Sequence, residues 1–94
     1  LIYVYLKHRD ENIVNTAGLE LGSRLHEVFG DRILGPDKPA VARVKTLSIR
    51  KIMLKLEIGI DYARVRQSLH NTIHELLKDK RYGALQVYFD VDPL

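Results

Sequence analysis

The apolar residues of this chain repeat at two different spacings, and the order of these spacings limits the possible folds. Residues 1–7 and 85–92 alternate between apolar and polar side chains, a pattern that predicts half-buried strands. Two segments, starting near residues 11 and 61, carry apolar residues at helical spacing, and a basic hairpin lies between them. The order βαββαβ predicts a single α+β domain over residues 1–94. We expect a ferredoxin-like split βαβ sandwich, with two helices on one face of a four-stranded antiparallel sheet.

Capping residues mark the ends of both predicted helices. The segment Asp10-Glu11-Asn12 supplies acidic and polar side chains at the start of the first helix, and Gly30 stands at the position of its C-cap. Asp61 is the expected N-cap of the second helix. We expect the apolar stripes of the two helices to consist of Ile13, Ala17, Leu21, Leu25 and Val28, and of Val65, Leu69, Ile73, Leu76 and Leu77.

The hairpin is expected to be irregular in its first arm. Pro36 and Pro39 interrupt regular pairing there, because proline has no backbone N–H to donate. The chain is expected to resume at residues 40–44 and to return as a strand over residues 47–56.

Positive charge is concentrated around this hairpin. The whole chain has a formal net charge of +3, whereas residues 32–66 hold nine basic and three acidic side chains, a balance of +6. A local field of this sign attracts phosphates, so we expect Arg43, Lys45, Arg50 and Lys51 to contact DNA. The alternative interpretation is a solvated hairpin whose charges only keep the chain in solution.

If both helices cover one face of the sheet, the other face is open. Alternation along the strands places six side chains on that face: Tyr3, Tyr5, Lys51, Met53, Lys55 and Tyr88. Aromatic and basic side chains on a sheet resemble the platform on which RNA-recognition domains stack bases, which makes Tyr5 a candidate stacking residue. The alternative is that a neighbouring domain of a longer protein covers this face.

Two short segments also resemble a known family. Leu34-Gly35-Pro36 is followed by Pro39-Ala40, by Arg43 and by a basic strand, and the chain ends in Asp90-Val91-Asp92-Pro93. In this order they resemble the C-terminal domain of primosomal protein N′ (PriA), the bacterial replication-restart DNA helicase, over essentially the whole chain. Many relatives place Arg-Trp-Gln on the returning strand, where this chain has Ile49-Arg50-Lys51 and contains no Trp.

The resemblance implies a role within a longer parent protein. That parent would be an ATP-dependent 3′→5′ helicase of the bacterial cytoplasm that recognises stalled forks and assembles the primosome. Its ATP, magnesium and zinc would be bound by preceding domains. This chain, which starts at Leu1 without Met, would be the excised C-terminal domain and would hold no cofactor. It would bind branched or single-stranded DNA and would contact the helicase lobes.

The start of the second helix is a candidate partner site. Arg64 and Arg66 flank a core residue there, and a basic pair at a helix N-terminus suits an anion held by arginine side chains and free N–H groups. A solvated edge is the simpler interpretation. The resemblance implies that Arg64 contacts the acidic C-terminal tail of single-stranded DNA-binding protein, and Ser68 stands where some relatives have Gln.

Motifs for catalysis are missing from the sequence. It contains no Walker-type phosphate loop and no Cys, which fits a cytoplasmic protein without disulfides. His70 and His74 lie one helical turn apart but lack a third metal ligand, so we expect solvated or packing roles for them. Asp90 and Asp92 could share a cation, but we expect them to cap the last strand and pair with basic residues.

No apolar run approaches the ~20 residues that a membrane span needs. We therefore expect a binding domain without enzymatic activity, without a metal site and without a membrane partner. The alternative function is a free-standing ferredoxin-like domain that binds proteins or, in the manner of a ribosomal protein, RNA.

Overall fold

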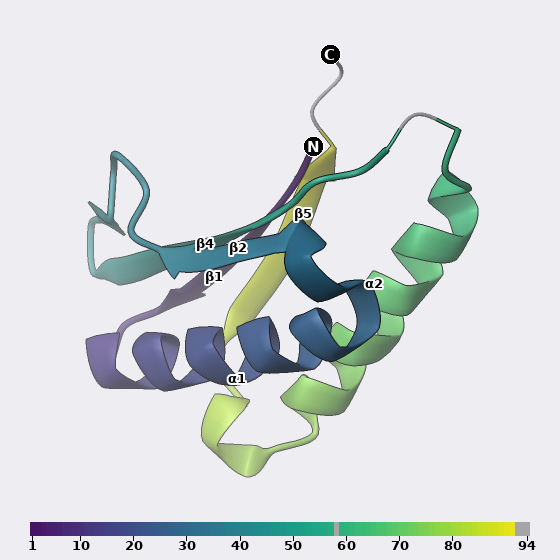
Figure 1. The fold of residues 1–94 in the computed structure, drawn as a ribbon. Helices are drawn as coiled ribbons and strands as arrows, with labels where there is room; N and C mark the ends of the chain where they lie inside the picture. The colour runs from purple at the N-terminus through teal and green to yellow at the C-terminus, as the bar shows by residue number, and fades with distance from the viewer. Residues whose placement is uncertain (58, 92–94) are drawn as a thin grey trace.

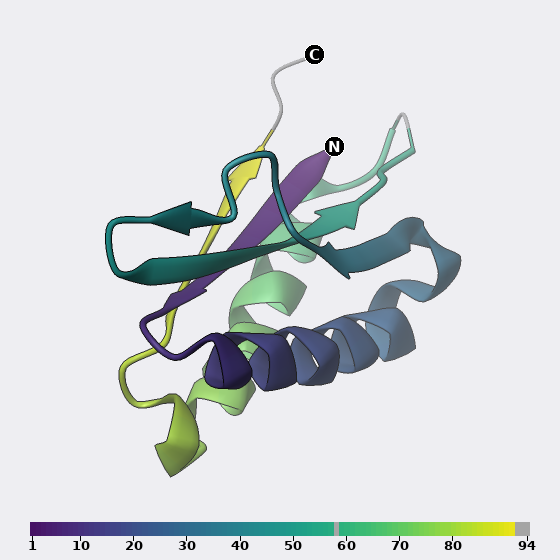
Figure 2. The same cartoon turned by 90° about the vertical axis from the view of Figure 1, so that its left-hand side faces the viewer.

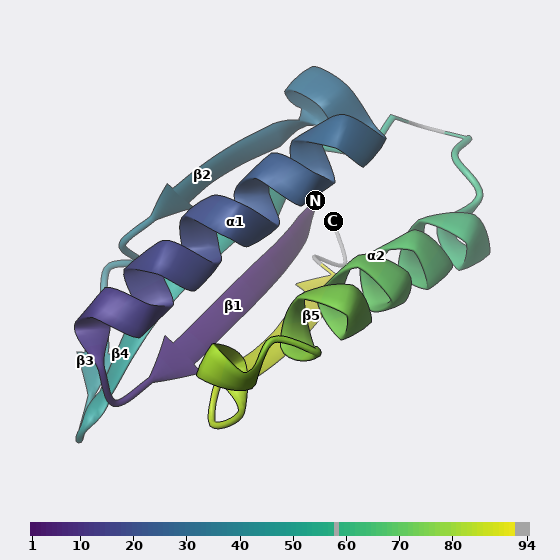
Figure 3. The ribbon, with the colours of Figure 1, turned by 90° about the horizontal axis from the view of Figure 1, so that it is seen from below.

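Two helices and a five-stranded antiparallel sheet make up the structure (Figure 1). The computed structural model describes residues 1–57 and 59–91. In chain order, its elements are β1 (Ile2–His8), α1 (Glu11–Phe29), η1 (Gly30–Arg32), β2 (Ile33–Asp37), β3 (Arg43–Val44), β4 (Leu47–Leu54), α2 (Tyr62–Leu77), η2 (Lys80–Tyr82) and β5 (Gln86–Val91). Both helices lie on the same side of the sheet, as Figures 1 and 3 show. The predicted α+β class is confirmed.

The strands follow the order β2-β4-β1-β5 across the sheet, and β3 pairs with the start of β4. The sequence predicted four strands, whereas the described residues form five. The difference lies in the first arm of the hairpin, which we expected as one interrupted strand. It forms two separate strands, β2 and β3, and only residues 43–44 of the resumed segment pair with β4 (Figure 2).

A bulge allows β2 to continue past its proline. Leu34 pairs with Met53 and Asp37 pairs with Lys51, so two residues of β2 stand opposite one residue of β4. Gly35 takes a φ of 98° in this bulge, a conformation that glycine adopts without strain. The prolines therefore distort the first arm, as expected. β4 ends at Leu54, two residues before the predicted end of the strand.

The core fills the space between the sheet and the helices. On β1, Ile2, Val4 and Leu6 are fully buried, while Tyr3, Tyr5 and Lys7 alternate with them, as predicted. The helices contribute Val14, Ala17, Leu21, Leu25, Val65, Leu69, Ile73 and Leu76, and Ile13 and Leu77 are half-buried at its margin.

Two glycines belong to the buried face of α1, although a count of apolar side chains overlooks them. A Cβ on Gly18 would lie 3.3 Å from the Pro36 side chain, and one on Gly22 would lie 3.2 Å from it. The helix backbone therefore packs directly onto β2.

The prediction that Val28 lies in the core was wrong, because this side chain is 52% exposed. It lines a hollow between α1 and α2 in which the second helix presents Asn71, Thr72 and Glu75. No apolar side chain of α2 lines this hollow to cover the valine.

The predicted helix ends are confirmed. The Asp10 carboxylate accepts a hydrogen bond from the Asn12 N–H, the Asp61 carboxylate accepts one from the Ala63 N–H, and Gly30 has a φ of 65°. β5 begins one residue later than expected. The predicted roles of Asp92 and of the terminal segment lie outside the described residues.

Candidate nucleic-acid interface

The face of the sheet opposite the helices gathers aromatic and basic side chains from three strands. The register places Tyr3 beside Met53, and Tyr5 between Lys51 of β4 and Tyr88 of β5. Figure 1 shows that both helices lie on the other side. We call Tyr3, Tyr5, Lys7, Lys51 and Tyr88 the tyrosine platform.

The rings of the tyrosine platform form a continuous row. The Tyr5 and Tyr88 ring centroids are 5.2 Å apart with an interplanar angle of 25°, and those of Tyr3 and Tyr5 are 6.4 Å apart. The Lys7 Nζ lies 5.1 Å from the centroid of the Tyr88 ring, and the Lys51 Nζ lies 5.1 Å from that of Tyr3. Such a row offers π-faces for bases and adjacent ammonium groups for phosphates.

Asp90 introduces negative charge next to the tyrosine platform. It stands opposite Tyr3 in the pairing of β1 with β5. Burial raises the pKa of the Tyr5 phenol above its usual value, and the nearby Asp90 carboxylate raises it further. The Tyr5 phenol is therefore uncharged at neutral pH.

The predicted phosphate contact Arg50 lies on the opposite face of the sheet from its neighbour Lys51. Its side chain points toward the helices and the residue is only 5% exposed. The Arg50 Nε donates to the Asn15 Oδ1 at 2.7 Å, and its Nη2 donates to the Glu11 Oε1 at 3.2 Å. Because Arg50 joins α1 to β4 from inside the fold, we leave it out of the candidate interface.

Arg43 is also separated from the tyrosine platform. It pairs with Ser48 in the β3–β4 ladder, and its Nη1 donates to the Ser48 Oγ at 2.6 Å. Ser48 and Lys51 are three residues apart on β4, so they lie on opposite faces of the sheet. Arg43 shares the face of its partner Ser48 and is therefore on the helix side. Lys45 is exposed in the turn between the two strands, and Lys55 is exposed beyond the end of β4. Of the four predicted phosphate contacts, Arg43 and Arg50 are thus on the helix side of the sheet, Lys45 is in the turn, and Lys51 is on the open face.

Both predicted arginines of α2 are exposed, whereas Ser68 is half-buried. In the part of the chain that the structure describes, no ion pair involves Arg64 or Arg66. The expected free N–H groups are partly occupied, because the Asp61 carboxylate accepts hydrogen bonds from the Ala63 and Arg64 N–H groups. An anion at this position would therefore be held mainly by arginine side chains.

His70 and His74 are exposed, and the ring of His70 packs edge-on against Phe89 with centroids 5.2 Å apart. Across residues 1–57 and 59–91, no group of three or more His, Cys, Asp or Glu side chains is placed to hold a metal ion. No helix in the same residues is both long and apolar enough to cross a membrane.

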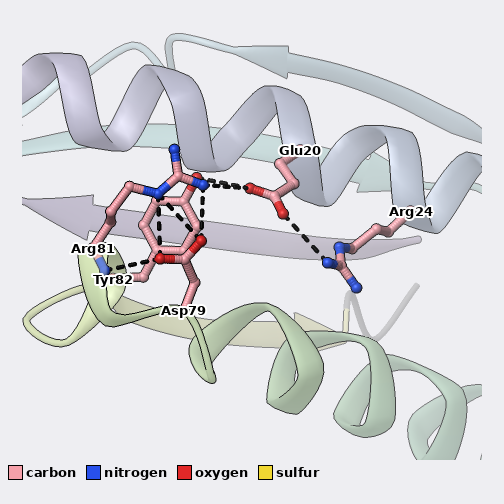
Figure 4. A network of polar contacts seen from close by, with 5 residues as sticks. All are labelled: Glu20, Arg24, Asp79, Arg81 and Tyr82. Atoms are coloured by element: carbon pink, nitrogen blue, oxygen red, sulfur yellow. Dashed lines mark hydrogen bonds and ion pairs between the residues drawn. The ribbon is translucent and has the colours of Figure 1, made fainter.

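A polar network on the helix side connects α1 with η2 (Figure 4). The buried Tyr82 donates its hydroxyl to the Glu20 Oε2 at 2.8 Å, and burial together with this bond raises its pKa to about 12. Glu20 also pairs with Arg24, and Arg81 pairs with Asp79, which lowers the pKa of the Asp79 carboxyl. No local pattern in the sequence predicts this network, which holds the segment that leads into β5.

Tyr3, Lys7 and Tyr88 were not among the predicted DNA contacts, and Lys7 was also missing from the side chains expected on the open face. Lys7 alternates with Leu6 along β1, which puts it on the open face, but it lies outside the basic hairpin from which the phosphate contacts were predicted.

No protein-family model matches the chain, and a search of curated proteins finds no match either. The function therefore has to be inferred from the geometry of the tyrosine platform and from the sequence resemblance.

Proposed function

We propose that this chain is the C-terminal DNA-binding and partner-docking domain of a primosomal replication-restart helicase, and that its tyrosine platform binds the single-stranded part of branched DNA. The observation that carries the proposal is the row of three tyrosines flanked by Lys7 and Lys51 on the face opposite the helices. Tyrosine rings stack on bases of any sequence, and ammonium groups pair with phosphates, so such a face suits single strands.

The topology supports the same assignment. Without the short β3, the sheet order β2-β4-β1-β5 with β1 and β4 at the centre fits a ferredoxin-like split βαβ fold, which the resemblance to primosomal protein N′ also implies. In this proposal the parent works in the bacterial cytoplasm. Its other domains supply ATP hydrolysis, magnesium and zinc, and this domain binds without catalysing a reaction.

Titration of the 94-residue chain with fluorescent 12-nucleotide single strands tests the platform. We expect weak, sequence-independent and salt-sensitive binding, and we expect Tyr5→Ala to weaken it by ~1–3 kcal/mol for each base that stacks there. Replacing Lys7 or Lys51 by Gln should each reduce the log–log salt slope by about 0.7.

Two exposed residues of the helix layer provide matched controls. Tyr62→Ala removes a tyrosine that is 51% exposed on α2, and Lys80→Gln removes an exposed cation from η2. Neither should change binding. If Tyr5→Ala and Tyr62→Ala bind equally well, the platform is not the DNA site.

The alternative is a ribosomal-type RNA-binding domain, because a platform of tyrosines also stacks RNA bases. An RNA strand of the same sequence distinguishes the two functions. Clearly tighter binding of RNA than of DNA would favour the alternative.

We also propose that the acidic tail of single-stranded DNA-binding protein docks at the start of α2. The exposed arginines without ion partners in the described residues support this assignment. In the full parent protein, Arg64→Glu should weaken binding of a labelled tail peptide at least tenfold, about 1.4 kcal/mol, whereas Lys80→Glu should not. The rest of this pocket would come from the helicase lobe, so the isolated chain should bind the tail poorly. Unchanged affinity in the Arg64→Glu parent would remove this site.

A further inference from the structure

A projecting segment between β2 and β4 combines exposed apolar side chains with cations. We call residues 38–46 the arm. Val41 is 61% exposed and Val44 is 44% exposed. Lys38, Arg43 and Lys45 belong to the same segment and are exposed as well. Two exposed valines in a segment that also carries three exposed cations are unexpected if that segment only connects two strands.

A tight turn braced by hydrogen bonds forms the tip of the arm. β3 and β4 are joined by the two residues Lys45 and Thr46, and Lys45 takes a φ of 55°, in a region that L side chains enter at a cost. The Arg43 guanidinium braces the turn, because it donates to the Ser48 Oγ at 2.6 Å and to the Thr46 carbonyl at 3.4 Å. Val44 is thus held at the surface by a turn with defined hydrogen bonds.

The arm lies at the end of the face that carries the tyrosine platform. Val44 pairs with Leu47, and paired residues share a face of the sheet, so Val44 is on the same side as Lys51. Arg43 faces the other side. Figure 3 shows the β3–β4 tip beyond the first turn of α1, at the edge of the molecule. A single DNA strand that lies on the tyrosine platform and runs toward the β3–β4 turn would contact the arm.

We propose that the arm is a wedge for the junction between duplex and single-stranded DNA. Val44 and Val41 contact the last base pair, and Lys45 and Lys38 bind phosphates of the strands that diverge there. Apolar side chains inserted beside bases unstack them, and nearby cations supply attraction to the polyanion without reading its sequence. The exposed cations of the same segment favour this occupant over an apolar protein surface. The inference rests on the proposed function, because the platform must hold the single strand that leaves the junction.

A forked DNA with 2-aminopurine at the last paired position tests the wedge in the 94-residue chain. Unstacking of that base raises its fluorescence, so the wild-type chain should raise it at saturation. The double variant Val41→Thr, Val44→Thr keeps the side-chain shape but adds hydroxyls to the apolar surface. It should abolish the rise and weaken fork binding about fivefold, with affinity for a single strand unchanged.

Two further variants distinguish the effect of the wedge from a general loss of stability or of exposed apolar surface. Val28→Thr changes a comparably exposed valine on α1 and should leave both affinities and the fluorescence unchanged. Lys45→Asn keeps a residue that tolerates positive φ but removes the charge, so it should weaken fork binding while the unfolding midpoint in urea stays constant.

The outcomes distinguish the wedge from the platform. Single-strand binding with no fluorescence rise on the fork overturns the wedge and leaves the platform intact. If the double variant Val41→Thr, Val44→Thr and the control Val28→Thr have the same fork affinity and the same fluorescence, the wedge is likewise overturned and the platform remains. If single strands do not bind at all, the proposed function fails and the wedge fails with it.

Discussion

The two faces of the sheet consist of alternate residues of the same strands, yet they have opposite physical properties. On the helix side, Leu6 of β1 and Ile52 of β4 are fully buried. One residue away on the same strands, Tyr5 and Lys51 face outward, beside each other in the β1–β4 register. The helix side is thus a mainly apolar layer with Ser48 and Arg50 buried in it, and the open side carries tyrosine rings and ammonium groups around the buried Ile49.

The contrast is greatest between Arg50 and Lys51. Arg50 donates hydrogen bonds to two side chains of α1 and to a backbone carbonyl, and it is 5% exposed. The Lys51 ammonium lies over the Tyr3 ring on the other face. Adjacent positive charges in a sequence can therefore have unrelated roles, because the face on which each side chain lies decides whether it stabilises the fold or can reach a ligand.

The largest expected effect concerns the buried side of β1. Leu6→Ala should lower the free energy of unfolding by about 2–5 kcal/mol, because it removes apolar contacts and leaves a cavity. Lys7→Ala, on the open side of the same strand, should change it by less than about 0.5 kcal/mol. Urea unfolding of both variants measures the difference. Equal losses would mean that the open side is as tightly packed as the helix side.

A smaller effect separates Arg50 from Lys51. Arg50→Met should cost about 1–3 kcal/mol of stability, since it leaves the buried Ile49 carbonyl without this donor, whereas water can replace it at the exposed Asn15. Its half-exposed partner Glu11 adds little to this cost. The salt slope of DNA binding should stay the same. Lys51→Met should do the reverse, with stability unchanged and the slope reduced by about 0.7. A flatter slope in Arg50→Met would return Arg50 to the DNA site.

Much of the layer arrangement could be predicted from the sequence, because alternation along β1 and helical spacing along α1 and α2 are local patterns. Asp10 and Asp61 marked the helix starts for the same reason. Gly18 and Gly22 were overlooked because a buried glycine has no side chain to enter an apolar pattern.

The distribution of the basic residues over the two faces could not be predicted as easily. Alternation along β4 is local and already separates Arg50 from Lys51, but the face of Arg43 depends on the register of β3 against β4, which is set by pairing between segments. The contact between Tyr82 and Glu20 joins residues 62 positions apart, so no local pattern contains it.

The smallest predicted effect concerns the acidic residue beside the tyrosine platform. Asp90 stands opposite Tyr3, beside the rings and ammonium groups of the tyrosine platform. A carboxylate there repels the phosphates that Lys7 and Lys51 would attract. Because the interaction crosses water, the repulsion should amount to only about 0.5 kcal/mol.

Asp90→Asn should therefore tighten single-strand binding about twofold, with the gain larger at low ionic strength and absent at about 1 M salt, where screening is strong. Asp79→Asn is a poor control, because the Asp79 carboxylate accepts hydrogen bonds from the backbone and side chain of Arg81. Asp31, which is exposed near the end of α1, is a suitable one, and Asp31→Asn changes the net charge equally. An equal gain in both variants would indicate a general effect of net charge. A gain confined to Asp90→Asn would place the bound strand on the face opposite the helices, next to Tyr3.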